Sequence, residues 1–341
     1  MLKEAIKTLV NHQHITREKA YHAMEQIMTG QATDAQISAF ITALSMKGET
    51  IDEITGCAEV MDKHAEKVLL DKEAIDIVGT GGDGTGTFNI STCAAFVTVA
   101  AGLPVAKHGN RSVSSRCGSA DVLEALGVEI ALTPDEARQC FSRTNVCFMF
   151  APGYHKSMKH AAGPRKELGI RSIFNILGPM TNPARAPYRL MGVYSEALCE
   201  PLVKVLVRLG IKGVLAVHGH DGLDEISISG PTTVCEAKNG HIISYILHPE
   251  SLGLPCYPLS EVIGGDAAQN AEILLNVLKG EPGAKRDIVL INSAAALYAA
   301  DYAQTLKEGL EMARKAIDSG AALKKLNDYR EATLAIKEAR G

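Results

Sequence analysis

Apolar positions over residues 1–70 recur every three to four residues, which is the spacing of one buried helix face. The clearest set is Ile37, Phe40, Ile41 and Leu44. Helix starts are marked by Thr16 and by two capping-box patterns, Thr33 with Gln36 and Thr50 with Glu53. Gly30 and Gly48 stand where helices would stop. The pattern therefore predicts a small all-helical bundle.

From Ala74 onward, short β-branched runs alternate with longer apolar segments. The predicted elements in this part of the chain are residues 75–78, 93–101, 104–106, 120–126 and 146–150. The alternation resumes with strands at 189–194 and 214–217, a helix at 200–209, and a hairpin of 233–237 and 241–246 joined through Asn239-Gly240. Strands that alternate with helices indicate a mainly parallel sheet covered by helices.

Prolines and glycines interrupt this rhythm between Pro152 and Pro187. We expect the chain to leave the sheet here and to cross back toward the helical bundle. The predicted fold class is α/β, with a small discontinuous helical domain and a larger α/β domain. The helical domain comprises residues 1–70 with about 155–187, and the α/β domain comprises 71–154 with about 188–341.

A loop with five glycines follows the first predicted strand and leads into an apolar helix. Glycine brings backbone amides close to a ligand, and a helix N-terminus favours negative charge, so the loop is suited to an anion. The spacing Gly79-x-Gly81-x-x-Gly84 also fits a dinucleotide fingerprint, which needs an acidic residue about 20 positions later. No Gly-Lys-Ser/Thr closes the loop as in a Walker motif, and a purely structural glycine turn is the remaining alternative.

The second predicted strand of this part runs into a basic, hydroxyl-rich loop instead of an acidic residue. Its sequence is Lys107-His108-Gly109-Asn110-Arg111-Ser112-Val113-Ser114-Ser115. This composition favours a phosphate ligand over the ribose diol of a nicotinamide nucleotide. Because both loops follow neighbouring strands at their carboxyl ends, we expect them to form one site.

Together, Gly-Thr-Gly-Gly-Asp…Asn-Ile-Ser-Thr and Lys-His-Gly-Asn-Arg-x-x-Ser-Ser resemble the two signature loops of the anthranilate phosphoribosyltransferase family. The resemblance extends over nearly the whole chain. It implies transfer of the phosphoribosyl group of phosphoribosyl pyrophosphate to the amine of anthranilate, the second step from chorismate to tryptophan. The products would be N-(5-phosphoribosyl)anthranilate and pyrophosphate. Such a transfer needs positioning and leaving-group stabilisation more than a protein nucleophile, and we assign no catalytic residue.

The resemblance also implies site residues. Donor-binding positions would be Gly79, Gly82, Asp83, Thr87, Asn89, Ile90, Ser91, Thr92, Lys107, His108, Gly109, Asn110, Arg111, Ser112, Val113, Ser114, Ser115 and Ser119. Acceptor-binding positions would be Gly79, Asn110 and Arg165. Two Mg²⁺ ions per subunit are implied, one held by Asp224 and Glu225 and one touched by Ser91. His108 and His155 are expected near the acceptor channel, whereas His218 and His220 are interpreted as loop structure.

Composition narrows the classes of function and the compartment. A net charge of -4 without a long basic run argues against general nucleic-acid binding. Eight cysteines without a Cys-x-x-Cys pair indicate reduced core thiols. Neither a secretory signal nor an apolar run of the ~18 residues that a membrane span needs is present. We expect a cytoplasmic protein, and the family implies a homodimer and an anthranilate synthase amidotransferase component as a candidate partner.

Two other functions use the same scaffold. A pyrimidine nucleoside phosphorylase would need a loop after Lys107 shaped for free phosphate, and Asn110-Arg111 departs from that pattern. A non-enzymatic nucleic-acid-binding homologue would show degraded signature loops and a basic groove. Here the loops are intact and the chain is acidic.

Overall fold

The computed structural model describes residues 1–112 and 116–340. The predicted donor positions Val113, Ser114 and Ser115 lie outside the described residues. The chain begins with four helices, α1 (Leu2–Val10), α2 (Arg17–Met28), α3 (Asp34–Lys47) and α4 (Ile51–His64). Both predicted capping boxes form, at Thr33 and at Thr50, and α3 ends at Gly48 with φ 84°. The predicted helical bundle is confirmed, with Ile37, Phe40, Ile41 and Leu44 buried.

The larger part of the molecule is built on a sheet whose strand order is β3-β2-β1-β4-β5-β6-β7 in the described residues. The strands are β1 (Ile75–Gly79), β2 (Val105–Gly109), β3 (Val146–Phe150), β4 (Tyr188–Gly192), β5 (Gly213–Gly219), β6 (Thr232–Lys238) and β7 (His241–Leu247). Pairing from β3 to β5 is parallel, and β6 and β7 pair antiparallel. Asn239 and Gly240 both have positive φ, which confirms the predicted hairpin turn.

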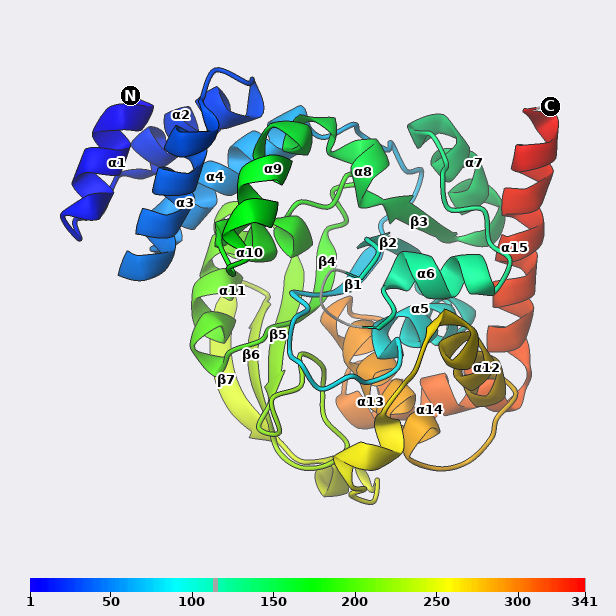
Figure 1. The fold of residues 1–341 in the computed structure, drawn as a ribbon. Coiled ribbons are helices and arrows are strands. Elements are labelled where there is room, and N and C mark those ends of the chain that lie inside the picture. Colours follow the sequence, from blue (N-terminus) through cyan, green and yellow to red (C-terminus); the bar gives the residue numbers. More distant parts are fainter. Residues whose placement is uncertain (113–115, 341) are drawn as a thin grey trace.

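Helices cover both faces of this sheet (Figure 1). On one face α5 packs against α13, α14 and α15, and on the other α11 packs against β5 and β6 and contacts α4. The helices of the α/β part are α5 (Ile90–Ala100), α6 (Ser119–Ala125), α7 (Pro134–Thr144), α11 (Cys199–Arg208), α12 (Ala267–Leu278), α13 (Ala284–Ala299), α14 (Leu306–Asp318) and α15 (Ala321–Ala339). Short 3₁₀ turns are η2 (Glu196–Leu198), η3 (Pro249–Leu252) and η4 (Leu259–Val262).

The chain leaves the sheet after β3 and returns to it at β4. The helices of this insertion are α8 (Ala151–Tyr154), η1 (Lys156–Met158), α9 (Lys159–Leu168) and α10 (Ile173–Met180). α9 packs against α2 and α3, and α10 packs against α3 and α4. In Figure 1 α9 and α10 lie beside the N-terminal bundle, as the interrupted sequence pattern predicts.

Three local predictions need correction. Lys107 and His108, interpreted as loop, belong to β2 and are buried, where the Lys107 ammonium donates to the carbonyl oxygen of Ile77 and the His108 amide to Asp76. Likewise His218 lies within β5, where Nδ1 is 2.8 Å from the carbonyl oxygen of Val193. Seven of the eight cysteines are buried as expected, but Cys256 is exposed instead of lying in the core. In the part of the chain that the structure describes, no helix is long and apolar enough to span a membrane.

Candidate active site

The first glycine-rich loop connects β1 to α5 and is held in place by its own side chains. Asp83 accepts hydrogen bonds from the amide (3.3 Å) and hydroxyl (2.6 Å) of Thr85. Thr87 forms an isolated bridge with Ile263. Gly81, Gly82, Gly84 and Gly86 all have positive φ, so the loop depends on glycine for its path. The helix that follows begins at Ile90, three residues before the prediction.

Asn89 precedes α5 and Thr92 lies in its first turn. The Asn89 amide donates to the carbonyl oxygen of Cys117 at 3.1 Å, and its oxygen accepts from Asn270 at 2.9 Å. Asn89 thus ties the first loop to the second. The Thr92 hydroxyl is buried and has no hydrogen-bond partner among the described residues.

An acidic turn after β5 lies directly against the first loop. The Gly81 amide donates to Oδ2 of Asp224 at 2.7 Å. A Cβ on Gly79 would stand 2.6 Å from that same oxygen, and a Cβ on Gly192 would stand 1.5 Å from the Asp224 carbonyl oxygen. Both strands therefore need glycine where the acidic turn crosses them. The structure therefore brings Asp224 against the glycine loop, and the magnesium role expected for Asp224 and Glu225 stays a prediction.

The two carboxylates share a confined, charged environment. Burial raises the pKa of Glu225 to about 7, while Lys107 and the amide and hydroxyl of Ser91 favour its charged form. The pKa of Asp224 is raised well above its ordinary range by burial and by the neighbouring charges of Asp83 and Glu225. A bound cation would stabilise the charged forms of two carboxylates that repel one another in this way.

Lys107 is the cation that faces this acidic pair from β2. Its ammonium donates to the carbonyl oxygen of Ile77 and to the Ser91 hydroxyl, the latter at 3.2 Å. Burial lowers its pKa, and the carboxylates of Asp76, Glu225 and Asp224 oppose that shift. The structure thus joins the starts of both loops and the acidic turn around one buried amine.

The second loop is fixed by the N-terminus of α6. Asp121 accepts from the amides of Ser112 (3.0 Å) and Gly118 (2.8 Å) and from the Arg111 guanidinium (3.0 Å). Arg111 also pairs with Glu124, so its charge is directed toward α6 rather than left open. These contacts hold the backbone on either side of residues 113–115.

The remaining predicted positions of this loop differ in exposure. Asn110 is exposed, and its side-chain oxygen accepts from the Arg111 amide at 2.8 Å. A Cβ on Gly109 would lie 2.5 Å from the hydroxyl oxygen of Ser119, which shows how closely α6 approaches β2. The Ser119 hydroxyl therefore faces the end of β2.

The insertion after β3 carries two arginines, Arg165 on α9 and Arg171 between α9 and α10. Arg165 on α9 stacks over the Phe174 ring at 5.0 Å and has no carboxylate partner among the residues described. Partial burial lowers its pKa. Arg171 donates to the carbonyl oxygen of Gly82 and lies over the Tyr194 ring at 4.4 Å. The sequence reasoning missed Arg171; its signal was an arginine inside the proline-rich and glycine-rich insertion.

Two buried histidines lie behind the second loop. The rings of His108 and His155 are 4.9 Å apart, and Nε2 of His155 is 3.1 Å from the carbonyl oxygen of Thr181. Burial lowers the pKa of His108 to about 4 and that of His155 to about 3. Nε2 of His108 and Nδ1 of His155 have no partner within the described part of the chain. Both rings are therefore neutral hydrogen-bonding groups, not cations, near neutral pH.

The side chains of the acidic turn and of Ser91 have the chemistry that magnesium requires. Asp224, Glu225 and Ser91 offer hard oxygen ligands, and burial raises the pKa of both carboxyls, so a bound cation would favour their charged forms. Within residues 1–112 and 116–340, no group of three or more His, Cys, Asp or Glu side chains forms a metal cage. An oxygen site with so few protein ligands is typical of an ion that also binds phosphate and water.

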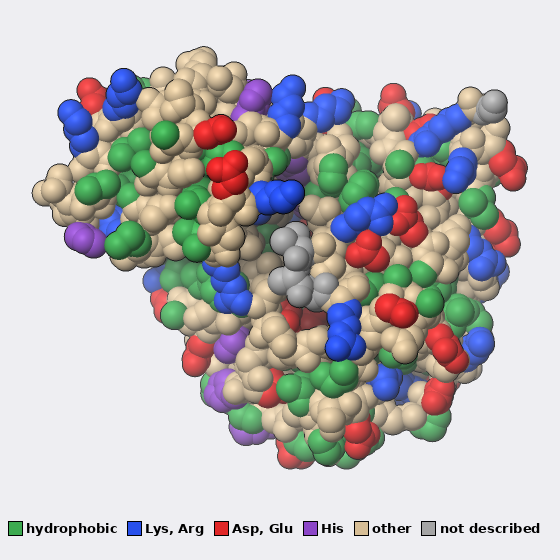
Figure 2. All heavy atoms as spheres, in the orientation of Figure 1, with side chains coloured by type: hydrophobic (Ala, Val, Ile, Leu, Met, Phe, Trp, Pro, Cys, Tyr) green, Lys and Arg blue, Asp and Glu red, His purple; other side chains and the backbone are tan. Residues whose placement is uncertain are grey.

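The face of the molecule seen in Figure 2 is hollowed between the helical lobe, at upper left, and the larger lobe, and Lys and Arg side chains lie at the edge of the hollow.

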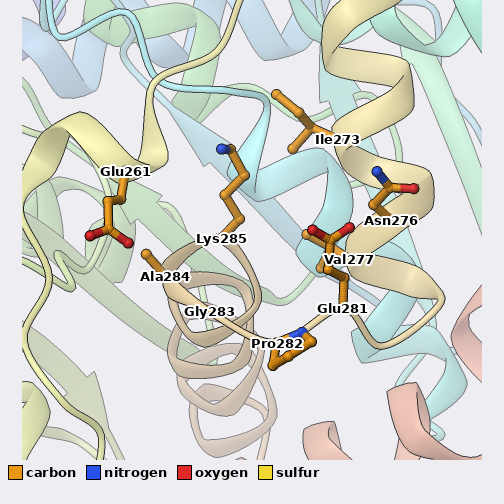
Figure 3. Close-up of a pocket in the computed structure, with 9 residues that line it drawn as sticks. All are labelled: Glu261, Ile273, Asn276, Val277, Glu281, Pro282, Gly283, Ala284 and Lys285. Carbon is orange, nitrogen blue, oxygen red and sulfur yellow. The ribbon is translucent and has the colours of Figure 1, made fainter.

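A separate pocket lies between η4, α12 and the start of α13 (Figure 3). Its lining residues are Glu261, Ile273, Asn276, Val277, Glu281, Pro282, Gly283, Ala284 and Lys285. None of them belongs to the two loops or the acidic turn, so this pocket is not part of the candidate site.

Two family models match the chain. Residues 3–65 match a glycosyl transferase family helical bundle domain, and residues 71–323 match a glycosyl transferase family a/b domain. The anthranilate phosphoribosyltransferase of Ruminiclostridium cellulolyticum is 54% identical over 331 residues, covering 97% of each chain. That of Endomicrobium trichonymphae is 54% identical over 333 residues, covering 98% of this chain and 99% of the relative.

Solved structures agree with these sequence relatives. The anthranilate phosphoribosyltransferase of Thermus thermophilus superposes with a TM-score of 0.92 at 40% identity, covering 96% of this chain and 99% of the other. The Saccharomyces cerevisiae enzyme in complex with PRPP and Mg superposes with a TM-score of 0.89 at 30% identity, covering 98% of each chain. The same yeast enzyme has also been solved with 4-fluoroanthranilate.

Proposed function

The chain belongs to the anthranilate phosphoribosyltransferase family, and from this membership we propose how its two lobes share the reaction. The enzyme transfers the phosphoribosyl group of phosphoribosyl pyrophosphate to the amine of anthranilate, in tryptophan biosynthesis. It releases pyrophosphate and forms N-(5-phosphoribosyl)anthranilate. One observation supports our division of roles: the glycine-rich loop, the start of the basic loop and the acidic turn meet around Lys107.

The donor half of the site is the anion cradle of the α/β lobe. We propose that the loop from Gly79 to Thr92 and the loop that starts at Lys107 bind the diphosphate and ribose of the donor. Positive-φ glycines expose backbone amides, and Lys107 and Ser91 add a buried ammonium and a hydroxyl. These groups stabilise negative charge that builds on the departing diphosphate.

Magnesium would be held by Asp224 and Glu225, with a second ion at Ser91. Such ions neutralise charge on a leaving diphosphate when they are bound. Relatives solved with magnesium support its use, and the raised pKa values of the acidic pair support the place we propose. Repulsion between the two carboxylates is what the ions would relieve.

The acceptor half lies on the helical side. Arg165 has a planar guanidinium that no carboxylate of the described residues occupies, so it is suited to bind the carboxylate of anthranilate. Asn110 and Gly79 would complete this acceptor subsite. No protein base is required in this arrangement, because the reaction is promoted by positioning an amine against an oxocarbenium-like centre.

The domain organisation follows from the same division. We propose a helical domain of residues 1–70 with about 155–187 and an α/β domain of residues 71–154 with about 188–341. The packing of α9 and α10 against α2, α3 and α4 supports this division. Exposed apolar side chains on the first helices, Met1, Val10 and Met46, support a homodimer formed through the helical domain. We further propose a cytoplasmic location and the amidotransferase component of anthranilate synthase as a candidate partner.

The decisive experiment is an assay with purified protein, phosphoribosyl pyrophosphate, anthranilate and Mg²⁺. We expect anthranilate fluorescence to disappear only when both substrates and the metal are present. A nucleoside phosphorylase would instead cleave pyrimidine nucleosides with free phosphate, and that assay serves as the control. No turnover with the complete mixture would reject the proposed function.

A further inference from the structure

Three chain segments cross between the helical part and the sheet, and they hydrogen-bond to one another. The first crossing joins α4 to β1, the second follows β3 and includes α8, and the third joins α10 to β4. The Glu66 amide in the first crossing donates to the carbonyl oxygen of Tyr154 in the second at 2.8 Å. The Val68 amide donates to the carbonyl oxygen of Pro183 in the third at 3.1 Å. Nε2 of His155 and the carbonyl oxygen of Thr181 join the second crossing to the third. The three crossings therefore form one connected unit.

Asn182 attaches this unit to the sheet. Its side-chain nitrogen donates to Oδ2 of Asp76 on β1 and to the carbonyl oxygen of Ala106 on β2, both at 2.8 Å. Its side-chain oxygen accepts from the Ala184 amide at 2.8 Å. The residue is 2% exposed, and both of its side-chain polar atoms have hydrogen-bond partners within the protein. A carboxamide fixed at three points holds one orientation.

Asp76 extends the connection to the second loop. The residue is fully buried, and its other oxygen, Oδ1, accepts from the His108 amide at 3.2 Å. His108 follows Lys107, whose ammonium reaches Ser91 at the start of α5. The chain of contacts Asn182–Asp76–His108 thus runs from the third crossing to the strand end where the donor loop begins.

We propose that Asn182 is a positioning residue, which holds β1 at Asp76 and β2 at Ala106 in a fixed relation to the three crossings and so aligns the donor loops with the acceptor side. Buried polar groups are costly unless paired, and a hydrophobic packing of the same space would stabilise the fold without specifying this alignment. The inference rests on the proposed function for its kinetic test. Asn182 is not among the residues that we propose to contact either substrate.

The test compares Asn182→Ala with Thr333→Val as a matched control. Thr333 is also fully buried, and its hydroxyl accepts from the Glu129 amide at 3.2 Å, but it lies on α15 away from the crossings. Both variants should lower the melting temperature. Only Asn182→Ala should lower kcat/KM for phosphoribosyl pyrophosphate, by roughly 100-fold, which is the cost of about 1 Å of misplacement. A normal kcat/KM in a less stable Asn182→Ala protein would overturn the inference.

An exchange of the two side chains covers the case in which Asn182→Ala does not fold. In D76N/N182D the carboxamide introduced at position 76 can donate to the carboxylate introduced at position 182. The link between the third crossing and β1 is then restored, while the contact to Ala106 is lost. We expect the double variant to have a higher kcat/KM than D76N or N182D alone. Equal or lower activity would contradict a positioning role.

Hydrogen exchange separates this inference from the proposed function, because it needs no turnover. Without substrates, the amides of residues 66–68 and 107–109 should exchange faster in Asn182→Ala than in wild type, and should be unchanged in Thr333→Val. An inactive wild type would reject the proposed function and leave this comparison valid. Unchanged exchange at both segments in Asn182→Ala would reject the inference.

Discussion

The Gly81 amide donates a 2.7 Å hydrogen bond to Oδ2 of Asp224, across 143 positions of sequence. This contact joins the first glycine-rich loop to the acidic turn through the protein's own groups. A carboxylate held by a backbone amide is already oriented for a metal ion on its other side. The position of that amide and of the neighbouring glycines should therefore control metal use as well as donor binding.

Gly79→Ala should sharply reduce activity, since its Cβ would stand 2.6 Å from the Asp224 carboxylate and would displace it. We expect a loss of roughly 100-fold in kcat/KM, comparable to a 1 Å misplacement of a catalytic group. Steady-state kinetics at saturating Mg²⁺ would measure this loss. Gly153→Ala is the control, because a Cβ there meets nothing within 4 Å. Similar kinetics in the two variants would contradict the steric argument.

Asp224→Asn and Glu225→Gln should each raise the Mg²⁺ concentration needed for half-maximal activity. We expect a rise of roughly 10–100-fold, the range seen when partners around a metal are removed. Titration of Mg²⁺ at fixed substrate concentrations would measure it. Asp221→Asn, in the same turn, is the control, because its carboxylate accepts from the Ser227 hydroxyl. An unchanged magnesium requirement in both variants would place the metal elsewhere.

Metal-free stability should fall as the pH rises. The pKa of Glu225 is raised in the fold from 4.5 to about 7, so the folded state binds a proton that the unfolded chain releases. The stabilisation is complete below about pH 4.5 and is lost as the pH rises through about 7. Thermal unfolding between about pH 5 and about pH 8 should show a decline that is smaller in Glu225→Gln. An equal decline in both proteins would show that Glu225 is not responsible.

Arg165→Ala should weaken use of anthranilate much more than use of the donor. A charge-assisted pair is worth about 1.5–3 kcal/mol, so kcat/KM for anthranilate should fall by roughly 10–100-fold. Binding of phosphoribosyl pyrophosphate, measured by calorimetry with Mg²⁺, should change little. Lys166→Ala, its exposed neighbour on α9, is the control. Equal losses for both substrates would argue against an acceptor role.

Glu53→Ala should destabilise the helical bundle without a direct effect on the site. Its carboxylate is fully buried, pairs with the nearly buried Lys47 at 2.8 Å and also accepts from the Ile15 amide. Breaking a buried pair on one side costs about 3–5 kcal/mol. Lys63→Ala, which removes an exposed pair with Glu25, should destabilise the bundle much less, because solvent screens that pair. Chemical denaturation would compare them, and equal losses would contradict the burial argument.

Sequence patterns predicted the bundle and the mainly parallel sheet, because capping residues, β-branched runs and glycine turns act locally, and they placed the two loops at neighbouring strand ends. They failed where a polar residue belongs to the core. Lys107 appeared to start a loop, yet it lies in β2 because its ammonium finds the Ile77 carbonyl and the Ser91 hydroxyl. These hydrogen bonds depend on tertiary contacts, and the periodicity of apolar residues carries no information about such contacts.

The same limit explains the residues that sequence reasoning left without a role. Asp76 stands inside a β-branched run, an unusual place for a carboxylate, and only the structure shows that Asn182 and the His108 amide satisfy it. Arg171 reaches the Gly82 carbonyl from a segment 89 positions away. The roles assigned to individual loop residues stay predictions, because they depend on where a ligand's atoms lie.

The glycine at position 192 limits how this enzyme can change. Its hydrogen faces the Asp224 carbonyl so closely that any other residue would force the acidic turn off β4. Mutation can therefore alter the carboxylates themselves, one at a time, far more easily than it can move them to a new place. If the acidic turn holds magnesium as we propose, metal preference can vary through side-chain chemistry, whereas moving the site would require β1 and β4 to be rebuilt together.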